Sequence, residues 1–367
     1  MNQPKVDNRR LRELDFLRGI AIILVLLRHQ FLFALTSAMG WIGVDLFFVL
    51  SGFLVSSLLF KEYQKFQTID GKNFLIRRGF KIYPIYYLFY IVYFIPILMR
   101  NEKLDFTKMV YDLVFIQNYA RDWGYAYPAS WSLAVEEHFY FLLVFVFYLF
   151  AKSTALKKHF LNPKNFVTER VIIAILVLIL FLRFASNYYF EQLTIRNFTM
   201  THLRIDALLF GVLISYLYHY KLNYFKSLFQ KYANFAWIII IGLLSFTPFV
   251  EPIGSFFVKT IGFSMVYLAF GILFSYFLFT PNLNLKLDRF LTKPVVDFVA
   301  KIGFCSYSIY VIHTFVIFAV EQFKFQNHYV NFLLVFVISF LLGNLMTHYI
   351  EAFFLAMRDK RFPSKNK

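Results

Sequence analysis

Long apolar segments recur along the chain, and each is close to the length that a helix needs to cross a membrane. The first is LDFLRGIAIILVLLRHQFLFAL, from Leu14 to Leu35. A bilayer core of about 30 Å requires roughly 20 predominantly apolar residues in a helix. Because 59% of the 367 residues are hydrophobic, the chain holds enough apolar sequence for many such helices. The sequence therefore predicts an all-α polytopic membrane protein, with the lipid bilayer as its partner.

We predict about ten transmembrane helices. They lie near residues 15–36, 41–60, 83–99, 131–150, 170–187, 203–218, 234–250, 258–280, 301–321 and 330–354. No repeat of fixed period and no linker separates them. We therefore expect a single transmembrane domain at 15–355, between an N-terminal tail at 1–14 and a C-terminal tail at 356–367.

Basic residues fall mainly on one side of the predicted helices. If the N-terminus is cytoplasmic, 27 of the 38 Lys and Arg lie in inner segments and seven lie in outer segments. Cytoplasmic loops of membrane proteins are enriched in Lys and Arg, so this pattern predicts that both tails are cytoplasmic. It also explains most of the net charge of +17 without a nucleic-acid partner. The single cysteine, Cys305, excludes a disulfide framework and a cysteine-based metal cluster, and no metal site is expected.

Four basic residues remain inside predicted helices, at positions 18, 28, 183 and 204. A charge in a membrane span costs roughly 2.5–3.5 kcal/mol on insertion scales, so such residues often mark functional sites. Arg18 and His29 lie eleven residues apart in the first segment. That separation is about 20° past three helical turns and rises about 16 Å, so both side chains share one face. Arg18 is then near the cytoplasmic surface and His29 near mid-membrane.

Each of these residues also has a structural explanation. The long stem of Arg18 can reach the membrane interface, and His29 can bond to a neighbouring helix. A neutral imidazole inside a bundle is nevertheless a good candidate general base. Arg28 points about 100° away from His29 and either pairs with an acid or holds an anion.

A basic cluster precedes the third predicted helix, in FLIRRGFKIYPIYY. Arg77, Arg78 and Lys81 are explained by the usual enrichment of cytoplasmic loops in basic residues. The alternative is a site for a polyanionic cytosolic ligand, such as the phosphates of a nucleotide-bearing donor.

Carboxylates lie in the outer halves of two predicted helices. Asp45 is about one turn inside the outer surface, where a helix N-terminus stabilises negative charge. Glu136 and Glu137 occur together in SWSLAVEEHFYFLL. Neighbours on a helix point in different directions, so at least one of the two faces the bundle interior. A functional role is favoured for this pair.

The sixth and ninth predicted helices add three polar residues. Arg204 and Asp206 lie in the outer half of the sixth, either as mutual partners in a structural network or as part of a site. His313 lies near the middle of the ninth, on the same face as Ser306. Together, the polar residues of all these helices predict a passage with a basic inner mouth, central histidines and an acid-rich outer mouth.

Six stretches occur in an order that is typical of one protein family. They are LDFLRGIAIILVLLRH, GVDLFFVLSGFL, IRRGFKIYPIY, SWSLAVEEHFYF, RIDALLFG and CSYSIYVIH. In this order they resemble the signature stretches of the acyltransferase-3 family, which are integral-membrane O-acyltransferases. Arg18 and His29 match the family's arginine and histidine separated by ten residues. Arg77, Arg78 and Lys81 match its basic motif, with lysine where a third arginine is common.

The resemblance implies transfer of an acyl group, usually acetyl, from cytosolic acyl-CoA to a hydroxyl of a cell-surface carbohydrate or its lipid-linked precursor. It implies a bacterial inner-membrane location and no tightly bound cofactor, with acyl-CoA as donor substrate. The expected residues are catalytic His29, Glu136 and Glu137; donor-binding Arg18, Arg77, Arg78 and Lys81; and, for the acceptor or a supporting network, Asp45, Arg204, Asp206 and His313. Direct transfer with His29 as general base is favoured over a covalent acyl-histidine.

The competing class is a membrane transporter or a polysaccharide export partner. Charged residues within spans also mark substrate paths, and the same passage would serve one. Many transporters are built from internal repeats, and this sequence shows none.

Overall fold

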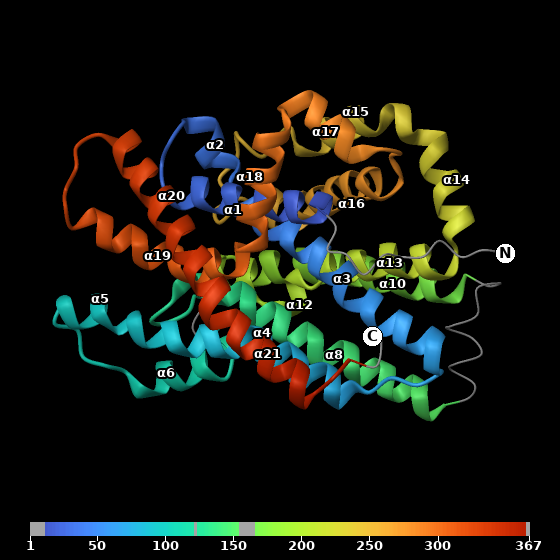
Figure 1. Ribbon diagram of the computed structural model, residues 1–367, viewed down its shortest axis with the longest axis horizontal. Coiled ribbons are helices and arrows are strands. Elements are labelled where there is room, and N and C mark those ends of the chain that lie inside the picture. Colours follow the sequence, from blue (N-terminus) through green and yellow to red (C-terminus); the bar gives the residue numbers. More distant parts are fainter. Residues whose placement is uncertain (1–11, 121–122, 154–165, 365–367) are drawn as a thin grey trace.

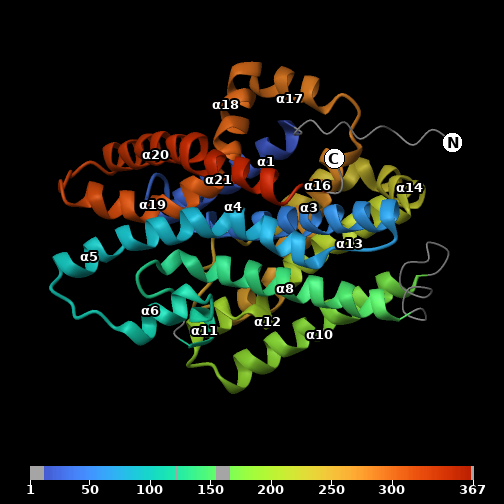
Figure 2. The same cartoon turned by 60° about the horizontal axis from the view of Figure 1, so that its bottom comes forward.

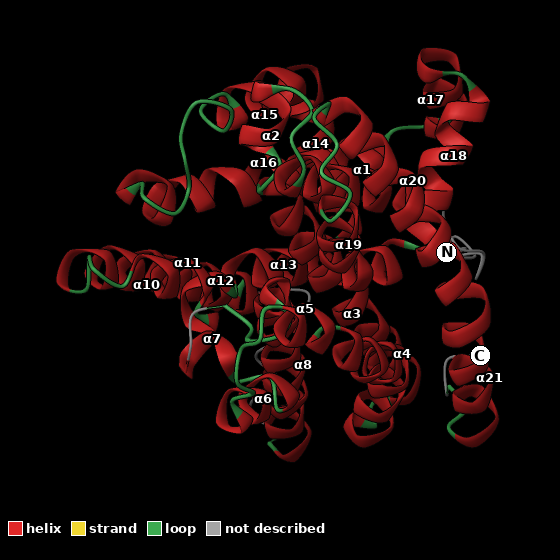
Figure 3. Cartoon of the chain, turned by 90° about the vertical axis from the view of Figure 1, so that its left-hand side faces the viewer, coloured by secondary structure: helices red, strands yellow, loops and turns green. Residues whose placement is uncertain are grey.

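The described chain consists of helices joined by short connections. The structure is a computed structural model that describes residues 12–120, 123–153 and 166–364. Within these ranges every regular element is a helix (Figure 3). The predicted all-α class is therefore confirmed.

The helices are numbered along the chain. Those of the N-terminal half are α1 (Arg12–His29), α2 (Ala34–Met39), α3 (Ile42–Phe66), α4 (Gly71–Val92), α5 (Phe94–Met99), α6 (Phe106–Leu113), α7 (Gln117–Ala120) and α8 (Trp131–Lys152). Next come α10 (Val167–Tyr189), α11 (Thr194–Thr199), α12 (Thr201–Arg204), α13 (Asp206–Tyr220), α14 (Leu222–Tyr232) and α15 (Ala236–Leu244). The last are α16 (Phe263–Phe279), α17 (Leu283–Leu291), α18 (Lys293–Phe304), α19 (Ser306–Glu321), α20 (His328–Leu345) and α21 (Ala352–Arg361). Short 3₁₀ turns are η1 (Pro128–Ser130) and η2 (Ala233–Phe235), and π-helical turns are η3 (Val258–Gly262) and η4 (Met346–Glu351).

Seven helical segments of the described chain are long and apolar enough to cross a membrane, or eight if the bent pair α18–α19 is one span. They are 42–66, 71–99, 128–149, 167–189, 222–244, 258–279 and 328–361. The multi-pass membrane class is confirmed. Two of the ten predicted transmembrane helices are not among these segments. The helix α1 carries several charges in its 18 residues, and α13 has only 15 residues. The number ten and the cytoplasmic termini stay predictions.

The central packing is between α3 and α13, which lie side by side in Figures 1 and 2. Glycines make this contact close. A Cβ atom on Gly52 of α3 would collide with the carbonyl oxygen of Leu208, and one on Gly211 of α13 would collide with that of Val49. Small residues at a helix crossing let two backbones approach, which is the usual basis of helix association in membranes.

The bend of 78° between α18 and α19 falls at the buried Cys305. It places the first turn of α19 inside the bundle, beside α1. There the Arg18 guanidinium donates from Nε and Nη2 to the Ser306 hydroxyl at 3.2 and 3.1 Å. Broken helices inside a membrane protein are tolerated where the freed polar groups find partners or line a cavity.

Two ends of the molecule can be distinguished along its long axis. The helices α5 and α6 lie at one end, and the C-terminal end of α8 lies at the other (Figures 1 and 2). The helix α21 lies against α4, the helix that carries the basic cluster.

Candidate functional site

A cavity of about 320 Å³ lies where α1, α3 and α4 meet the C-terminal helices, and we name it the basic cavity. Its lining includes all four predicted donor-binding residues, Arg18, Arg77, Arg78 and Lys81. Asp70 caps the N-terminus of α4 by accepting from the backbone N–H of Asn73, and the basic residues of the helix follow within three turns.

Acidic residues near the C-terminus form ion pairs with two of these four cations. Arg77 pairs with Asp359 at 2.9 Å and also donates to the carbonyl of Phe362. Lys81 forms an ion pair with Glu351. The partner residues lie in η4, α21 and the residue after it, so the C-terminal segment closes one side of the basic cavity.

Arg78 is the cation of this cavity that remains available. Within the described residues its guanidinium has no ion pair, and it lies 5.8 and 5.5 Å from the ring centres of Phe74 and Tyr140. An arginine that lies on aromatic rings keeps its N–H groups free to bind an anion.

Two smaller central cavities, of about 130 and 80 Å³, continue from the basic cavity. Arg18 and Glu136 line both. Glu136 accepts a hydrogen bond from the Tyr140 hydroxyl at 2.8 Å, and Tyr140 in turn lies 2.9 Å from the Ser51 hydroxyl. A carboxylate and a guanidinium therefore share the narrow middle of the protein.

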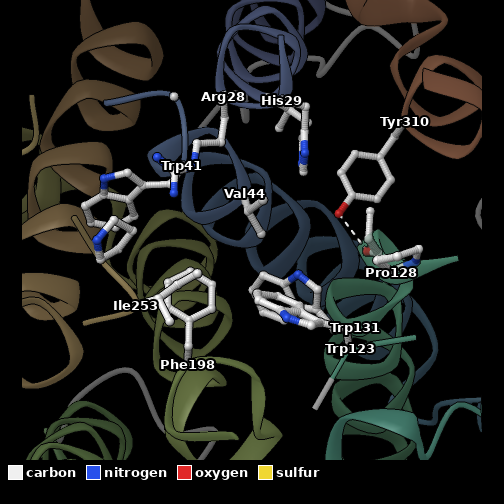
Figure 4. Close-up of a pocket in the computed structure, with 14 residues that line it drawn as sticks. Arg28, His29, Trp41, Val44, Trp123, Pro128, Trp131, Phe198, Ile253 and Tyr310 are labelled. Atoms are coloured by element: carbon white, nitrogen blue, oxygen red, sulfur yellow. Dashed lines mark hydrogen bonds between the residues drawn. The ribbon is translucent and has the colours of Figure 1, made fainter. Parts of the chain in front are cut away.

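A further cavity of about 300 Å³ contains His29, and we name it the histidine cavity. Figure 4 shows Arg28 and His29 on one side, Trp123 and Trp131 on the opposite side, and Val44 between them. The side chain of His29 is exposed. It is the last residue of α1, so the helix ends where the cavity begins.

Neighbouring cavities share lining residues from one end of this series to the other. Arg78 and Lys81 line both the basic cavity and the larger central cavity. Val44 and Tyr310 line both the smaller central cavity and the histidine cavity. The basic cluster of α4 and the histidine at the end of α1 are thus the two ends of one line of cavities.

A second imidazole lies directly behind His29. The ring of buried His313 is centred 5.1 Å from that of His29. Nδ1 of His313 lies 2.6 Å from the carbonyl oxygen of Tyr310, which can only accept, so Nδ1 carries a proton. Nε2 is then an acceptor in the neutral ring, and within the described chain it has no hydrogen-bond partner.

The predicted residues Asp45, Arg204 and Asp206 form buried ion pairs instead of lining a cavity. Arg204 pairs with Asp45 at 2.8 Å, and Asp206 pairs with Arg183 at 3.0 Å. All four side chains are at most 2% exposed. Arg204 and Asp206, considered as possible mutual partners, each have a different partner. These carboxylates therefore do not form the expected acid-rich outer mouth.

Arg204 nonetheless supports the wall of the histidine cavity. Its guanidinium lies 5.7 Å from the ring centre of Trp131 and 5.3 Å from that of Phe198. Both rings line the histidine cavity. The Asp45–Arg204 pair thus lies directly behind two of the aromatic residues that face His29.

Glu137 is separated from the other two residues expected to be catalytic. It is 5% exposed and accepts a hydrogen bond from the Tyr83 hydroxyl at 2.7 Å. It lines none of the four cavities, whereas Glu136 lines the central pair and His29 lines the histidine cavity. The three residues are not brought into one cavity.

The segment that carries Trp123 is fixed by one buried carboxylate. Asp112 of α6 accepts from the backbone N–H groups of Tyr125 and Ala126, at 2.8 and 3.1 Å, and from the Tyr90 hydroxyl at 2.9 Å. Burial raises the pKa of Asp112 to about 6, although the N–H and O–H donors act in the opposite direction. This carboxylate holds one wall of the histidine cavity against α4.

Several residues of the site were missed from the sequence. Glu351 and Asp359 were not considered as partners of the basic cluster, because nothing local in the sequence relates positions about 280 residues apart. Glu351 did carry a signal, since it is an acid inside the predicted apolar helix 330–354. The partner of Arg28 is Glu251, at 2.6 Å, and this pair lies at the histidine cavity.

The fold and the line of cavities define a multi-pass membrane protein with a polar path between helices. Comparison with known proteins identifies its class. A family model described as "Acyltransferase domain" matches residues 11–347. The chain belongs to the acyltransferase-3 family, as its motifs predicted, and it is a multi-pass bacterial membrane protein.

Two curated relatives show how far the similarity extends. The chain is 35% identical over 156 residues to the peptidoglycan O-acetyltransferase OatA of Listeria monocytogenes, covering 36% of this chain and 24% of that protein. It is 29% identical over 227 residues to the O-acetyltransferase OatA of Staphylococcus aureus, covering 57% of this chain and 35% of that protein. The matched region spans about a quarter to a third of these relatives. No solved structure matches the chain.

Proposed function

We propose that this protein transfers an acyl group, most simply acetyl, from acyl-CoA to a hydroxyl of a cell-envelope carbohydrate. The observation that carries the proposal is the line of cavities between the basic cluster and His29. The family membership and the O-acetyltransferase names of the relatives support the same reaction class.

The donor binds at the basic cavity in this proposal. Acyl-CoA carries several phosphates, and Arg78 offers an uncommitted guanidinium for them, since arginine binds phosphate oxygens in a bidentate way. Arg18 and Glu136 lie on the path that the thioester end would follow. Arg77 and Lys81 contribute once they are released from Asp359 and Glu351.

The acceptor hydroxyl reacts in the histidine cavity. His29 removes the hydroxyl proton while the oxygen attacks the thioester carbonyl, and the C–S bond breaks as the C–O bond forms. The CoA thiolate leaves and takes a proton from solvent, and the protonated His29 returns its proton to solvent, so the enzyme regains its starting state. His313 positions His29, because its ring is fixed by the Tyr310 carbonyl and lies against the catalytic imidazole. The domain limits 15–355 belong to the same proposal.

The test is transfer of labelled acetyl from acetyl-CoA to glycans extracted from a cell envelope, with protein reconstituted in lipid. We expect His29→Ala to reduce transfer by a factor of about 10² or more, the usual contribution of a general base. His348→Ala is the matched control, because His348 is exposed and lines none of the four cavities.

Two outcomes contradict parts of this proposal. Full activity of His29→Ala would keep the reaction and remove His29 as the base, with Glu136 the next candidate. Movement of labelled solute across the membrane without any label in glycan would favour the transporter class.

A further inference from the structure

Tryptophan is concentrated at the histidine cavity. The chain has four tryptophans, and three of them, Trp41, Trp123 and Trp131, line this cavity. Trp123, Trp131 and Phe198 also contact one another, with ring centres 5.4 to 6.2 Å apart. The fourth, Trp237 in α15, is 46% exposed and lies against Tyr276. Among the four cavities, tryptophan therefore lines the one that contains His29.

An aromatic wall opposite a histidine suits one kind of ligand. A pyranose ring has an apolar face of C–H groups and a polar edge of hydroxyls, so its face packs on aromatic rings while its edge meets polar groups. The cavity offers rings on one side and His29 on the other (Figure 4). Its volume of about 300 Å³ is at the small end of ligand pockets, which suits a single sugar unit.

The charge at this cavity is balanced. Arg28 lines it, and its guanidinium is 2.6 Å from the Glu251 carboxylate. Glu251 belongs to the connection between α15 and η3, and the next two residues, Pro252 and Ile253, also line the cavity. The ion pair fastens this connection over the cavity and compensates Arg28, which is the Lys or Arg residue of the described lining and would otherwise attract an acidic sugar.

We propose that the histidine cavity is an acceptor subsite for one uncharged pyranose unit, and that Glu251 sets the preference against acidic sugars by neutralising Arg28. This inference rests on the proposed acyl transfer and adds the chemical class of the acceptor. Trp123 and Trp131 hold the ring face, and the hydroxyl to be acylated points toward His29.

Binding can be measured without a donor, by the change in intrinsic tryptophan fluorescence. The probes are methyl glucoside and methyl glucuronide, which differ only in the carboxylate at C6. We expect saturable binding of the glucoside and at least tenfold weaker binding of the glucuronide. Trp123→Leu weakens glucoside binding at least tenfold, Trp123→Phe weakens it less, and Trp237→Phe leaves it unchanged.

Glu251→Gln tests the charge argument separately. It frees Arg28, so the glucuronide is expected to gain at least fivefold in affinity while the glucoside changes little. Thermal unfolding of each variant checks that it is folded. If Trp123→Leu does not fold, Trp123→Phe is used for the binding test in its place.

The results separate this inference from the proposed function. Absence of saturable glucoside binding, an equal effect of Trp237→Phe, or preference of the wild type for glucuronide would overturn the inference. If the glucoside binds as expected but no labelled acyl group is ever transferred, the acceptor subsite stands and the proposed function fails. If transfer occurs and Trp123→Leu leaves the acceptor KM unchanged, the function stands and the subsite fails.

Discussion

Single residues of the basic cluster differ in what they are free to do. Arg77 and Lys81 are held by Asp359 and Glu351, whereas Arg78 forms no ion pair among the described residues and lies on the rings of Phe74 and Tyr140. A sequence motif of three basic residues is therefore not three equivalent anion contacts. The difference lies in partners from the other end of the chain.

Arg78→Gln is expected to raise the KM for acyl-CoA by about tenfold or more and to change kcat little. Hydrogen bonds to a charged group contribute about 1.5–3 kcal/mol, and each 1.4 kcal/mol is a factor of ten. Steady-state kinetics with varied donor measures this. Arg358→Gln is the control, since Arg358 lines the same cavity but pairs with Asp359 at 2.9 Å; an equal effect of both variants would contradict the assignment.

The buried pair Arg183–Asp206 is a second residue-level case. Asp206→Asn leaves the fully buried Arg183 guanidinium without its counter-ion, and breaking such a pair typically costs about 3–5 kcal/mol. We expect a large drop in thermal stability in detergent. The double variant Arg183→Leu with Asp206→Leu should recover most of it, because two apolar side chains leave no buried charge. A stable single variant would show that Ser264, which lies 2.6 Å from Arg183, is a sufficient partner.

Among the elements, α21 has the clearest consequence for function. It lies against α4, supplies Arg358 to the lining of the basic cavity and pairs Asp359 with Arg77, while η4 before it supplies Glu351. These carboxylates occupy cations that phosphates would otherwise reach. If the proposed donor binds here, the C-terminal segment competes with it for the same charges.

Asp359→Asn is expected to strengthen CoA binding several-fold, because Arg77 is freed and partly exposed ion pairs are worth up to about 1 kcal/mol. Calorimetric titration of CoA measures the change. Asp288→Asn breaks the ion pair with Arg12, which belongs to none of the four cavities, and should have no effect. Unchanged or weaker binding for Asp359→Asn would refute the competition.

The elements also show what could be predicted from sequence. The length of the apolar segments predicted the class of multi-pass membrane protein. The spacing of Arg18 and His29 predicted that they lie at different depths on one helix, and both residues lie on α1. The motifs identified the family. The bend at Cys305 was missed, because no proline interrupts the predicted helix 301–321. Long-range pairs such as Arg204 with Asp45 depend on packing between α3 and α12, which no local pattern reports.

For the molecule as a whole, the arrangement of the cavities matters more than any one residue. The basic cavity and the histidine cavity are separated by two small central cavities, and the shared walls are formed by α1, α3, α4, α8 and α19. In the proposed reaction, the donor enters from the basic cavity and the acceptor from the histidine cavity. The acyl group must then pass the narrow middle to reach the acceptor in the histidine cavity.

Val44→Phe tests the continuity of this path, because Val44 lines both the smaller central cavity and the histidine cavity. We expect the added ring to reduce acyl transfer at least tenfold while CoA binding stays within twofold of the wild type. Transfer and calorimetric assays on one preparation give both values. Undiminished transfer would mean that the acyl group does not pass this point.

The separation of the two ends has an electrical consequence. If the acceptor proton leaves from His29 on one side and the thiolate takes its proton on the other, each turnover moves one elementary charge across the membrane. A potential of 100 mV then changes the free energy of the cycle by about 2.3 kcal/mol. Glu136 lies midway along the cavities. If the proton returns by way of this carboxylate, the cycle moves no net charge across the membrane. The reaction rate in vesicles under an imposed potential distinguishes a current-generating enzyme from a neutral one.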